Sequence, residues 1–285
     1  MVDSIQQCCR PVRIEDRPQI EEIRARAGHT LSAHAFTSLY LWQKAMKLSV
    51  CLENDAFFVR FLQRGDNAWF YPCGSEEAQA RFLQAGLQTP EFSLHYVRRE
   101  DVAFIQSLFP GRFRFEEARG DFEYICDRAA QVEMQGAKFR KLRSKVNRGK
   151  HCCNWNVVRI CKENLPACRT IIQHWEHSGI SDREVALFSL EHFEELNMMG
   201  IILETAEGPQ ATAYGSCITN DVFDLHVAKT VMHNIDSYLK WELYSHLPET
   251  VRVVNLEEDL NLPGLRTSKL ESLPELIPLW KGVPI

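Results

Sequence analysis

The sequence predicts an α+β protein built from two similar modules. Segments with helical spacing of apolar residues alternate with short β-branched and aromatic segments along all 285 residues. The order strand, helix, helix, three strands, helix, strand occurs twice, which is typical of tandem α+β domains. The repeat is one of element order, because no sequence identity links the two halves. We place the two domains at residues 1–119 and 120–285.

The elements of the first module follow from apolar periodicity and turn chemistry. Ile20 and Ile23 share one face of a helix, and Ser75 and Gly86 are a suitable N-cap and stop for another. Glu-Asn-Asp and Arg-Gly-Asp-Asn are good turn sequences between extended segments. The expected elements are strand 12–14, helices 17–27 and 33–46, strands 48–52, 57–62 and 69–71, helix 75–85, strand 92–97 and helix 101–108.

The second module repeats this order after Gly120. Its three central strands form a meander, and its last strand is rich in valine, which favours extended structure. The expected elements are strand 155–160, helices 165–176 and 190–198, strands 201–204, 211–218 and 222–227, helix 237–247 and strand 251–256. His226 lies on an apolar strand, where a histidine is usually a hydrogen-bonded core residue.

Composition and charge exclude several classes of protein. The chain is 45% hydrophobic and 25% charged, as ordinary globular domains are, and its net charge of −5 gives no global reason for nucleic-acid binding. No stretch approaches the roughly 18 apolar residues of a membrane span. The N-terminal residues lack the apolar core of a signal peptide. We therefore expect a cytoplasmic protein without a transmembrane segment.

The ten cysteines do not form the framework of a small disulfide-rich domain. They are scattered, several lie within apolar segments, and we expect most of them to be reduced, structural thiols. One local group has the residue types of a zinc site but lacks the usual C-x₂₋₄-C spacing, so we predict no metal. Its members are His151, Cys152, Cys153, Cys161, Cys168, His174 and His177.

Residues 138–150 contain seven basic residues and no acidic residue. On a helix, Phe139, Leu142 and Val146 share one face, by which the helix would dock onto the core. Lys141, Lys145 and Arg148 fall on the opposite face, whereas Arg140, Arg143 and Asn147 fall between the two. The simplest interpretation is a solvated basic face, and the functional one is a surface that binds phosphate or nucleic acid.

The richest candidate site lies at residues 254–269. A β-branched strand leads into Glu257, Glu258 and Asp259, and a Pro-Gly turn at 263–264 precedes Arg266 and Lys269. Loops at strand ends often carry function because the scaffold fixes them while solvent reaches them. The alternative is a structural network of ion pairs.

These segments resemble a bacterial family related to the C-terminal domain of phosphatidylglycerol lysyltransferases. Residues 136–147 resemble its Gly-Lys-Lys…Lys-Arg-Asn…Asn helix, and 224–229 its His…Glu-Lys-Ala strand. Residues 254–269 resemble its closing Asn-Arg-Glu-Glu-Asp-Leu-Gly…Gly-Leu-Arg…Lys signature, and 33–42 resemble its first-domain helix more loosely. The resemblance implies two tandem GNAT-like acyltransferase domains. Leu256, Asn261 and Ala228 depart from the common Arg, Gly and Glu, which leaves substrate-facing details open.

The resemblance implies an acyltransferase that moves an aminoacyl group, with aminoacyl-tRNA as the candidate donor. The acceptor would be a small amine, a peptide or a lipid headgroup. Such a reaction needs a base and a group that stabilises the oxyanion. Glu258 or Asp259 is the candidate base or ammonium-binding group, and Arg266 and Lys269 are the candidate anion-binding groups. The residues expected to contact the donor are Arg140, Arg143, Asn147 and Lys229.

Two alternatives remain open from the sequence. The first is an acetyl-CoA-dependent N-acetyltransferase, in which an acyl-CoA would be the donor. Residues 231–237, where such an enzyme would need a glycine-rich pyrophosphate turn, contain no glycine, which argues against this alternative. The second is a non-catalytic module that binds RNA or protein through the basic helix. No serine or cysteine lies in a recognisable nucleophile motif, so we do not expect covalent catalysis.

Overall fold

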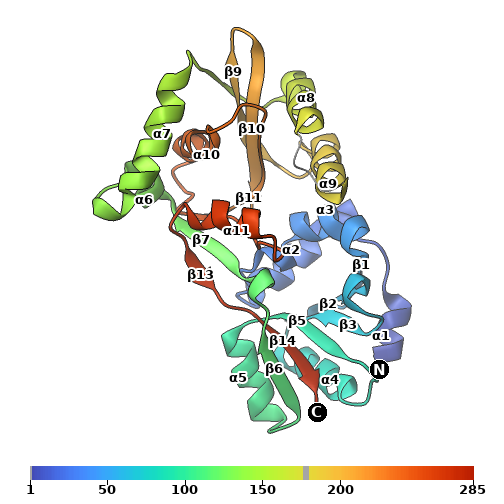
Figure 1. Ribbon diagram of the computed structural model, residues 1–285. Coiled ribbons are helices and arrows are strands. Elements are labelled where there is room, and N and C mark those ends of the chain that lie inside the picture. The colour runs from blue at the N-terminus through green and yellow to red at the C-terminus, as the bar shows by residue number, and fades with distance from the viewer. Residues whose placement is uncertain (1, 176–179) are drawn as a thin grey trace. The chain divides into compact units, whose positions relative to one another are not determined.

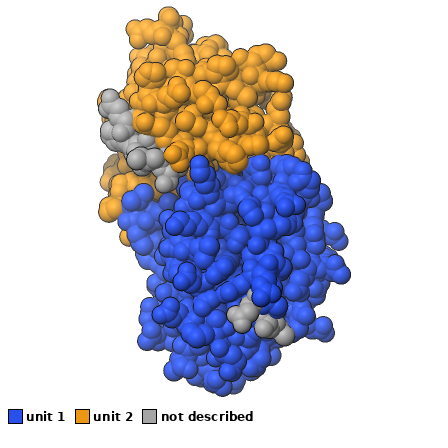
Figure 2. Space-filling view, turned by 90° about the vertical axis from the view of Figure 1, so that its right-hand side faces the viewer, with its two compact units in different colours: residues 1–123, 258–262, 277–285 blue, residues 124–257, 263–276 orange. Residues whose placement is uncertain are grey.

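The computed structural model describes residues 2–175 and 180–285, which form two compact units (Figures 1 and 2). The first unit comprises residues 1–123, 258–262 and 277–285, and the second comprises 124–257 and 263–276. The chain therefore returns to the first unit twice after leaving it, which two contiguous domains would not require. The domain boundary between residues 119 and 120 stays a prediction.

The first unit is a mixed sheet with helices. Its strands follow the order β1-β2-β3-β5-β14-β6, with β4 paired to β2. The pair β3–β5 is parallel, and the other pairs of described register are antiparallel. The helices are α1 (Val2–Cys8), α2 (Arg17–Arg26), α3 (Phe36–Met46), α4 (Glu76–Gly86) and α5 (Arg99–Leu108). The strands are β1 (Leu48–Leu52), β2 (Ala56–Phe61), β3 (Ala68–Phe70), β4 (Cys73–Gly74), β5 (Ser93–Val97), β6 (Phe113–Glu117) and β14 (Trp280–Pro284).

The second unit has a sheet of the same kind, in the order β13-β7-β12-β11-β10-β9-β8. The pair β11–β12 is parallel, and the flanking pairs of described register are antiparallel. The helices are α6 (Arg128–Glu133), α7 (Arg140–Cys152), α8 (Leu165–His174), α9 (Ile180–Glu191), α10 (Asp236–His246) and α11 (Pro263–Leu270). The strands are β7 (Glu123–Asp127), β8 (Asn156–Arg159), β9 (Met199–Thr205), β10 (Gly208–Cys217), β11 (Val222–Thr230), β12 (Val253–Asn255) and β13 (Glu275–Ile277).

Helices cover both faces of the second sheet, as Figure 1 shows. Along β10, Ala211 and Ala213 pack into the core formed with α7 and α10. The intervening Thr212 contacts Cys168 of α8, and Tyr214 contacts Ser189 of α9. This alternation is the two-residue period of a strand, and it explains why the central strands read as nearly continuous apolar segments.

The structure confirms the α+β class and most of the expected elements. Strand β1 has the predicted bounds, and Ser75 caps α4 by accepting a hydrogen bond from the amide of Ala78 at 3.2 Å. The basic segment forms α7, whose stripe of Phe139, Leu142 and Val146 is buried as predicted. No helix of the described ranges is long and apolar enough to cross a bilayer.

Three local predictions were wrong. Strand 12–14 is a short 3₁₀ turn at residues 14–16, held by an Arg10–Asp16 ion pair of 2.7 Å. Helix 190–198 is displaced: α9 ends at Glu191, and the following buried apolar residues lie in turns, with Asn197 at φ +50°. The expected Pro-Gly turn at 263–264 instead begins α11, because proline suits the first turn of a helix.

Cysteine pairing is a further correction. Cys8 and Cys51 form a disulfide within the first unit, so these two are not reduced thiols, whereas the other eight cysteines are free. In the cysteine and histidine group of residues 151–177, Cys168 is buried against Thr212, while Cys152 and Cys161 are exposed. His177 lies outside the described residues. The described members do not form a group with metal-ligand geometry.

Candidate functional site

The parallel strands β11 and β12 of the second unit stay paired for only three residues. Val222, Phe223 and Asp224 pair with Val253, Val254 and Asn255. Strand β12 then ends, whereas β11 continues to Thr230. We call this point the divergence of β11 and β12. Ligands in open sheets often bind where neighbouring parallel strands diverge, because side chains there are fixed but not covered by the next strand. The residues just beyond this point are therefore the candidate functional site.

His226 and Glu257 meet at this divergence. His226 follows the last paired residue of β11 by two positions, and Glu257 follows the last residue of β12 by two. Their atoms Nδ1 and Oε1 lie 2.7 Å apart, and the other ring nitrogen, Nε2, lies 2.9 Å from Oγ of Ser216 on β10. The three side chains thus form a continuous hydrogen-bonded row from β10 to the end of β12.

A β-bulge places His226 in this row. Tyr214 pairs with Val227 and Ser216 pairs with Asp224, so Leu225 and His226 both lie opposite Gly215. A Cβ atom added at Gly215 would lie 1.8 Å from the carbonyl oxygen of Asp224. Only glycine allows this close approach of two backbones, and bulges of this kind reorient a side chain next to functional sites.

The backbone after β12 fixes Glu257 from the other side. Its φ angle of +60° lies in the left-handed region, which costs a non-glycine residue free energy. The side-chain oxygen of Asn255 accepts a hydrogen bond from the Glu257 amide at 2.8 Å and helps to stabilise this conformation. A strained residue held by surrounding hydrogen bonds is frequent at functional sites.

Asp224 joins the same cluster. Ligand atoms of Asp224, His226 and Glu257 all lie within 4.8 Å of one another, which is the residue set and spacing of a divalent-metal site. Both ring nitrogens of His226, however, are already engaged by Ser216 and Glu257. The imidazole of His226 is therefore already engaged in two hydrogen bonds, and we assign no metal ion to the cluster.

Two lysines contribute positive charge to this part of the second unit. Lys269 of α11 is buried, donates to the carbonyl oxygen of Leu256, and lies 5.8 Å from the ring centroid of Tyr124. The Nζ atom of Lys229, on β11, lies 2.7 Å from Oδ2 of Asp182 and 3.4 Å from the ring centroid of Trp175. Burial lowers the pKa of Lys229, and the negative charge of Asp182 opposes this shift.

The predicted catalytic residues fall into two groups. Arg266 and Lys269 belong to the second unit, on α11, where Arg266 is half-buried. Glu258 and Asp259 pack within the first unit. There the hydroxyl of Tyr96 donates to Glu258 at 3.4 Å, and the fully buried Asp259 pairs with Arg119.

The predicted donor-binding residues are also separated. Arg140 and Asn147 are exposed on α7. Arg143 donates to the carbonyl oxygens of Met134 and Gly136, so it fixes the turn that leads into α7. Lys229 lies on β11 instead. The structure therefore gives Arg143 a structural contact and leaves Arg140 and Asn147 reachable from solvent.

The loop before α10 bears on the acetyl-CoA alternative. In the structure, residues 231–235 connect β11 to α10, and Asn234 adopts φ +64°. The helix begins at Asp236, whose carboxylate pairs with Lys240 at 2.9 Å. A negative charge in the first turn disfavours a bound pyrophosphate, which helix N-termini otherwise attract.

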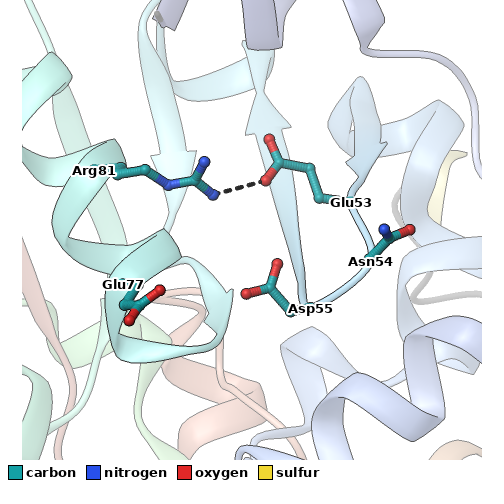
Figure 3. Close-up of a pocket in the computed structure, with 5 residues that line it drawn as sticks. All are labelled: Glu53, Asn54, Asp55, Glu77 and Arg81. Carbon is teal, nitrogen blue, oxygen red and sulfur yellow. Dashed lines mark hydrogen bonds and ion pairs between the residues drawn. The ribbon is translucent and has the colours of Figure 1, made fainter.

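A hollow of about 550 Å³ lies on the first unit. As Figure 3 shows, it lies beside the β1–β2 turn and α4, and Arg81 forms an ion pair with Glu53 at 3.0 Å. It contains none of the residues predicted from the sequence, and its acidic side chains give no specific ligand. The lining residues are Glu53, Asn54, Asp55, Glu77 and Arg81.

The row of Ser216, His226 and Glu257 is not predicted by the sequence. His226 is indeed buried, but its partner is an acid 31 positions later, and no local pattern connects the two. The one available signal was the presence of Asp224 and His226 within an otherwise apolar strand. Buried polar residues on an apolar strand need hydrogen-bond partners, so these two mark a candidate site.

Comparison with known proteins decides the family. The family model described as phosphatidylglycerol lysyltransferase, C-terminal, matches residues 24–281. The chain belongs to this family. The match confirms the resemblance found in the sequence. No curated protein matches the chain.

Solved structures show the fold of this phosphatidylglycerol lysyltransferase C-terminal family member. A conserved protein of unknown function from Bacteroides thetaiotaomicron has a TM-score of 0.87 at 21% identity, with 97% of this chain and 99% of that chain covered. L-PGS from Bacillus licheniformis has a TM-score of 0.65 at 16% identity, over 94% and 91%. The C-terminal domain of a putative lysylphosphatidylglycerol synthetase from Agrobacterium fabrum has a TM-score of 0.65 at 15% identity, with 94% of this chain and 91% of that chain covered.

The positions that depart from the family pattern have structural roles. Leu256 is buried in the core of the second unit, and its carbonyl oxygen accepts from Lys269. Asn261 packs against Gly120 so closely that a Cβ atom there would lie 2.3 Å from its amide nitrogen. Ala228 packs at the edge of the second core. All three residues therefore have packing roles in this chain.

Proposed function

We propose that the protein is an aminoacyltransferase, which moves an aminoacyl group from an aminoacyl-tRNA to an amine or hydroxyl acceptor. The observation that carries this proposal is the hydrogen-bonded pair of His226 and Glu257 at the divergence of β11 and β12. Acyl transfer needs a group that accepts the proton of the acceptor, and a held carboxylate at a strand end supplies one. Membership of the lysyltransferase family supports the choice of donor.

Lys269 and Arg266 are the proposed anion-binding groups. Both lie on α11, directly after the loop that follows β12. A buried ammonium and a half-buried guanidinium suit a carboxylate, a phosphate or a developing oxyanion. Lys229, Arg140 and Asn147 remain proposed donor contacts, as does Arg143, although its guanidinium already binds two carbonyl oxygens.

The other two predicted catalytic acids, Glu258 and Asp259, lie in the first unit. Each has a partner within the first unit, and the complete burial of Asp259 beside Arg119 favours the structural interpretation for that residue. Glu258 is half-buried and stays a proposed acceptor-binding acid. We also propose that the two units are tandem GNAT-like domains, because each sheet contains one parallel pair joined through a helix, β3–α4–β5 and β11–α10–β12.

A transfer assay tests the proposed function. The purified protein would be incubated with tRNA charged with radiolabelled lysine, together with phosphatidylglycerol vesicles or a mixture of soluble amines. We expect label to pass from tRNA to one acceptor class. Parallel reactions with acetyl-CoA and the same amines would report release of the CoA thiol. Thiol release without transfer from tRNA would establish the acetyltransferase alternative instead.

A second experiment separates catalysis from simple binding. If labelled tRNA binds tightly but no acceptor receives label, while the protein also leaves acetyl-CoA intact, the non-catalytic RNA-binding alternative would hold. The exposed basic residues of α7 favour an RNA contact under either interpretation.

A further inference from the structure

We propose that Glu257 is the general base of the transfer and that His226 is the residue that positions it. The inference rests on the function proposed above. It assigns the base to a residue that the sequence placed only within an acid cluster, and it adds a histidine that the sequence assigned to the core.

Accessibility along the hydrogen-bonded row shows which group can touch a substrate. Ser216 is fully buried, and the side chains of His226 and Glu257 are 3% and 13% exposed. The exposed fraction of the side chains therefore rises along the row from Ser216 to Glu257. An acceptor can reach Glu257, whereas His226 lies behind it.

The hydrogen-bond partners define the role of the imidazole. When Glu257 is ionised it only accepts hydrogen bonds, so Nδ1 of His226 carries the proton and donates to Oε1. Nε2 is then the acceptor for the Ser216 hydroxyl. This arrangement fixes the orientation of the ring and aims one donor at the carboxylate, as buried partners do for catalytic groups elsewhere.

The backbone also determines where the carboxylate lies. Glu257 keeps φ +60° although it is not a glycine, and Asn255 accepts its amide proton. On the other strand, the bulge opposite Gly215 sets the position of His226. Both partners are thus held by unusual backbone features that neighbouring residues stabilise, and such preorganisation favours catalysis over simple packing.

Charged groups near the pair lie on β11, α9 and α11. Asp224 and Lys229 lie on β11 with His226, and Asp182 of α9 neutralises Lys229. Lys269 of α11 binds the carbonyl oxygen of Leu256, the residue before Glu257. Lys229 interacts electrostatically with Glu257, whereas the neighbouring carboxylate of Asp224 repels it.

In the proposed transfer, Glu257 first takes up a proton and then releases it. A carboxylate oxygen of Glu257 takes the proton from the acceptor amine or hydroxyl while the acceptor lone pair forms a bond to the carbonyl carbon of the aminoacyl ester. The tetrahedral intermediate then collapses, the ester C–O bond breaks, and the proton passes from Glu257 to the departing ribose hydroxyl. The enzyme returns to its starting ionisation without a cofactor.

Glu257→Gly is the variant that tests the base. It removes the carboxylate, and glycine adopts φ +60° without strain, so the fold should survive. We expect kcat for transfer from lysyl-tRNA to fall about 10²-fold or more with little change in KM, and added formate to restore part of it. Glu91→Gly, which replaces an exposed glutamate at φ +55° in the first unit, is the matched control and should keep most of the activity.

His226 is tested by a conservative and a disruptive variant. His226→Gln keeps a donor toward Glu257 and an acceptor toward Ser216, so it should retain a large part of kcat. His226→Leu removes both hydrogen bonds, and we expect a loss of roughly 10-fold or more, with the acid limb of the pH–rate profile moved to higher pH. If Gln is as inactive as Leu, and the acid limb disappears in both, His226 itself is the base and the assignment to Glu257 is wrong.

The outcomes separate this inference from the proposed function. If the wild-type protein transfers label and Glu257→Gly transfers it at the same rate, only the assignment of the base fails. If the wild-type protein transfers label from no aminoacyl-tRNA, the proposed function fails and this inference fails with it. A melting curve for each variant shows whether an activity loss reflects unfolding, and formate rescue of Glu257→Gly would exclude that cause.

Discussion

The carboxylate of Asp259, fully buried in the first unit, forms an ion pair with the guanidinium of Arg119 at 2.9 Å. Its other oxygen accepts the amide proton of Asn261 at 2.8 Å. Asp259 therefore closes the loop after β12, where the sequence alone indicated a catalytic acid. Removing one partner of a buried pair leaves the other charge without compensation.

Asp259→Ala should destabilise the protein by about 3 kcal/mol or more. Urea unfolding followed by circular dichroism measures this change. The control is Glu116→Ala, which removes an exposed partner of Arg114 and should change the free energy of unfolding by less than about 1 kcal/mol. A catalytic role without a structural one would leave the stability of Asp259→Ala close to that of wild type and abolish transfer.

Gly215→Ala should disrupt the bulge between β10 and β11. The new methyl group would meet the Asp224 carbonyl oxygen, a backbone atom that cannot move without breaking the ladder. We expect a loss of roughly 4 kcal/mol, at the upper end for single substitutions. Gly264→Ala is the matched control, because nothing lies near its added atom and alanine favours the helix there. Equal stability of both variants would refute the close approach.

Buried histidines in the first unit predict a loss of stability in acid. Burial lowers the pKa of His34 and of His95 to about 3, and burial also lowers the pKa of His29. The unfolded chain takes up these protons below about pH 6.5, and the folded chain does not, so the free energy of unfolding falls as pH falls from 6.5 toward 3. The upper limit at pH 5 is about 2 kcal/mol for each histidine.

His29→Phe isolates one of these contributions. Neither ring nitrogen of His29 has a hydrogen-bond partner within the described residues, so the variant removes the titration without breaking a bond. We expect unchanged or higher stability at pH 7 and a smaller loss between pH 7 and pH 5, measured by urea unfolding at both values. His151→Gln changes an exposed histidine and serves as the control. Curves parallel to wild type would show that the pKa of His29 is the same in the folded and the unfolded protein.

The outward face of α7 predicts salt-dependent RNA binding. Replacing Lys141, Lys145 and Arg148 with alanine should weaken binding of a labelled tRNA acceptor stem and lower the slope of log affinity against log salt by about 2 to 3. Fluorescence anisotropy at several salt concentrations measures this. Removing three exposed cations elsewhere, at Arg99, Arg112 and Lys162, should have little effect. Equal losses from both sets would indicate nonspecific charge attraction.

The sequence predicts those helices and strands that are determined by residues close together in the chain. β1 and α4 were found because apolar spacing, a serine N-cap and turn sequences lie within a few residues of each other. β14 was not found, since its position between β5 and β6 depends on strands more than 160 positions earlier. The turn at 192–197 was mistaken for helix because its buried residues, including Phe193 and Leu196, happen to lie at helical spacing.

The candidate site lies at a strand end that the sequence indicates, but its arrangement could not be predicted. The sequence indicated the end of the last strand of the second module, where Glu257 does lie. It could not indicate that Glu257 pairs with His226, because that contact requires the β11–β12 register and the bulge at Gly215. Nor could it show that neighbouring acids pack within different units.

Hydrogen–deuterium exchange in the presence of a substrate analogue tests the position of the proposed site most directly. The ligand would be a non-hydrolysable amide analogue of the lysylated 3′ end of tRNA. The proposed position of the site predicts slower exchange in residues 222–230 and 253–257, where β11 and β12 diverge, together with α11. Protection confined to other segments, such as the hollow beside α4 in Figure 3, would contradict it.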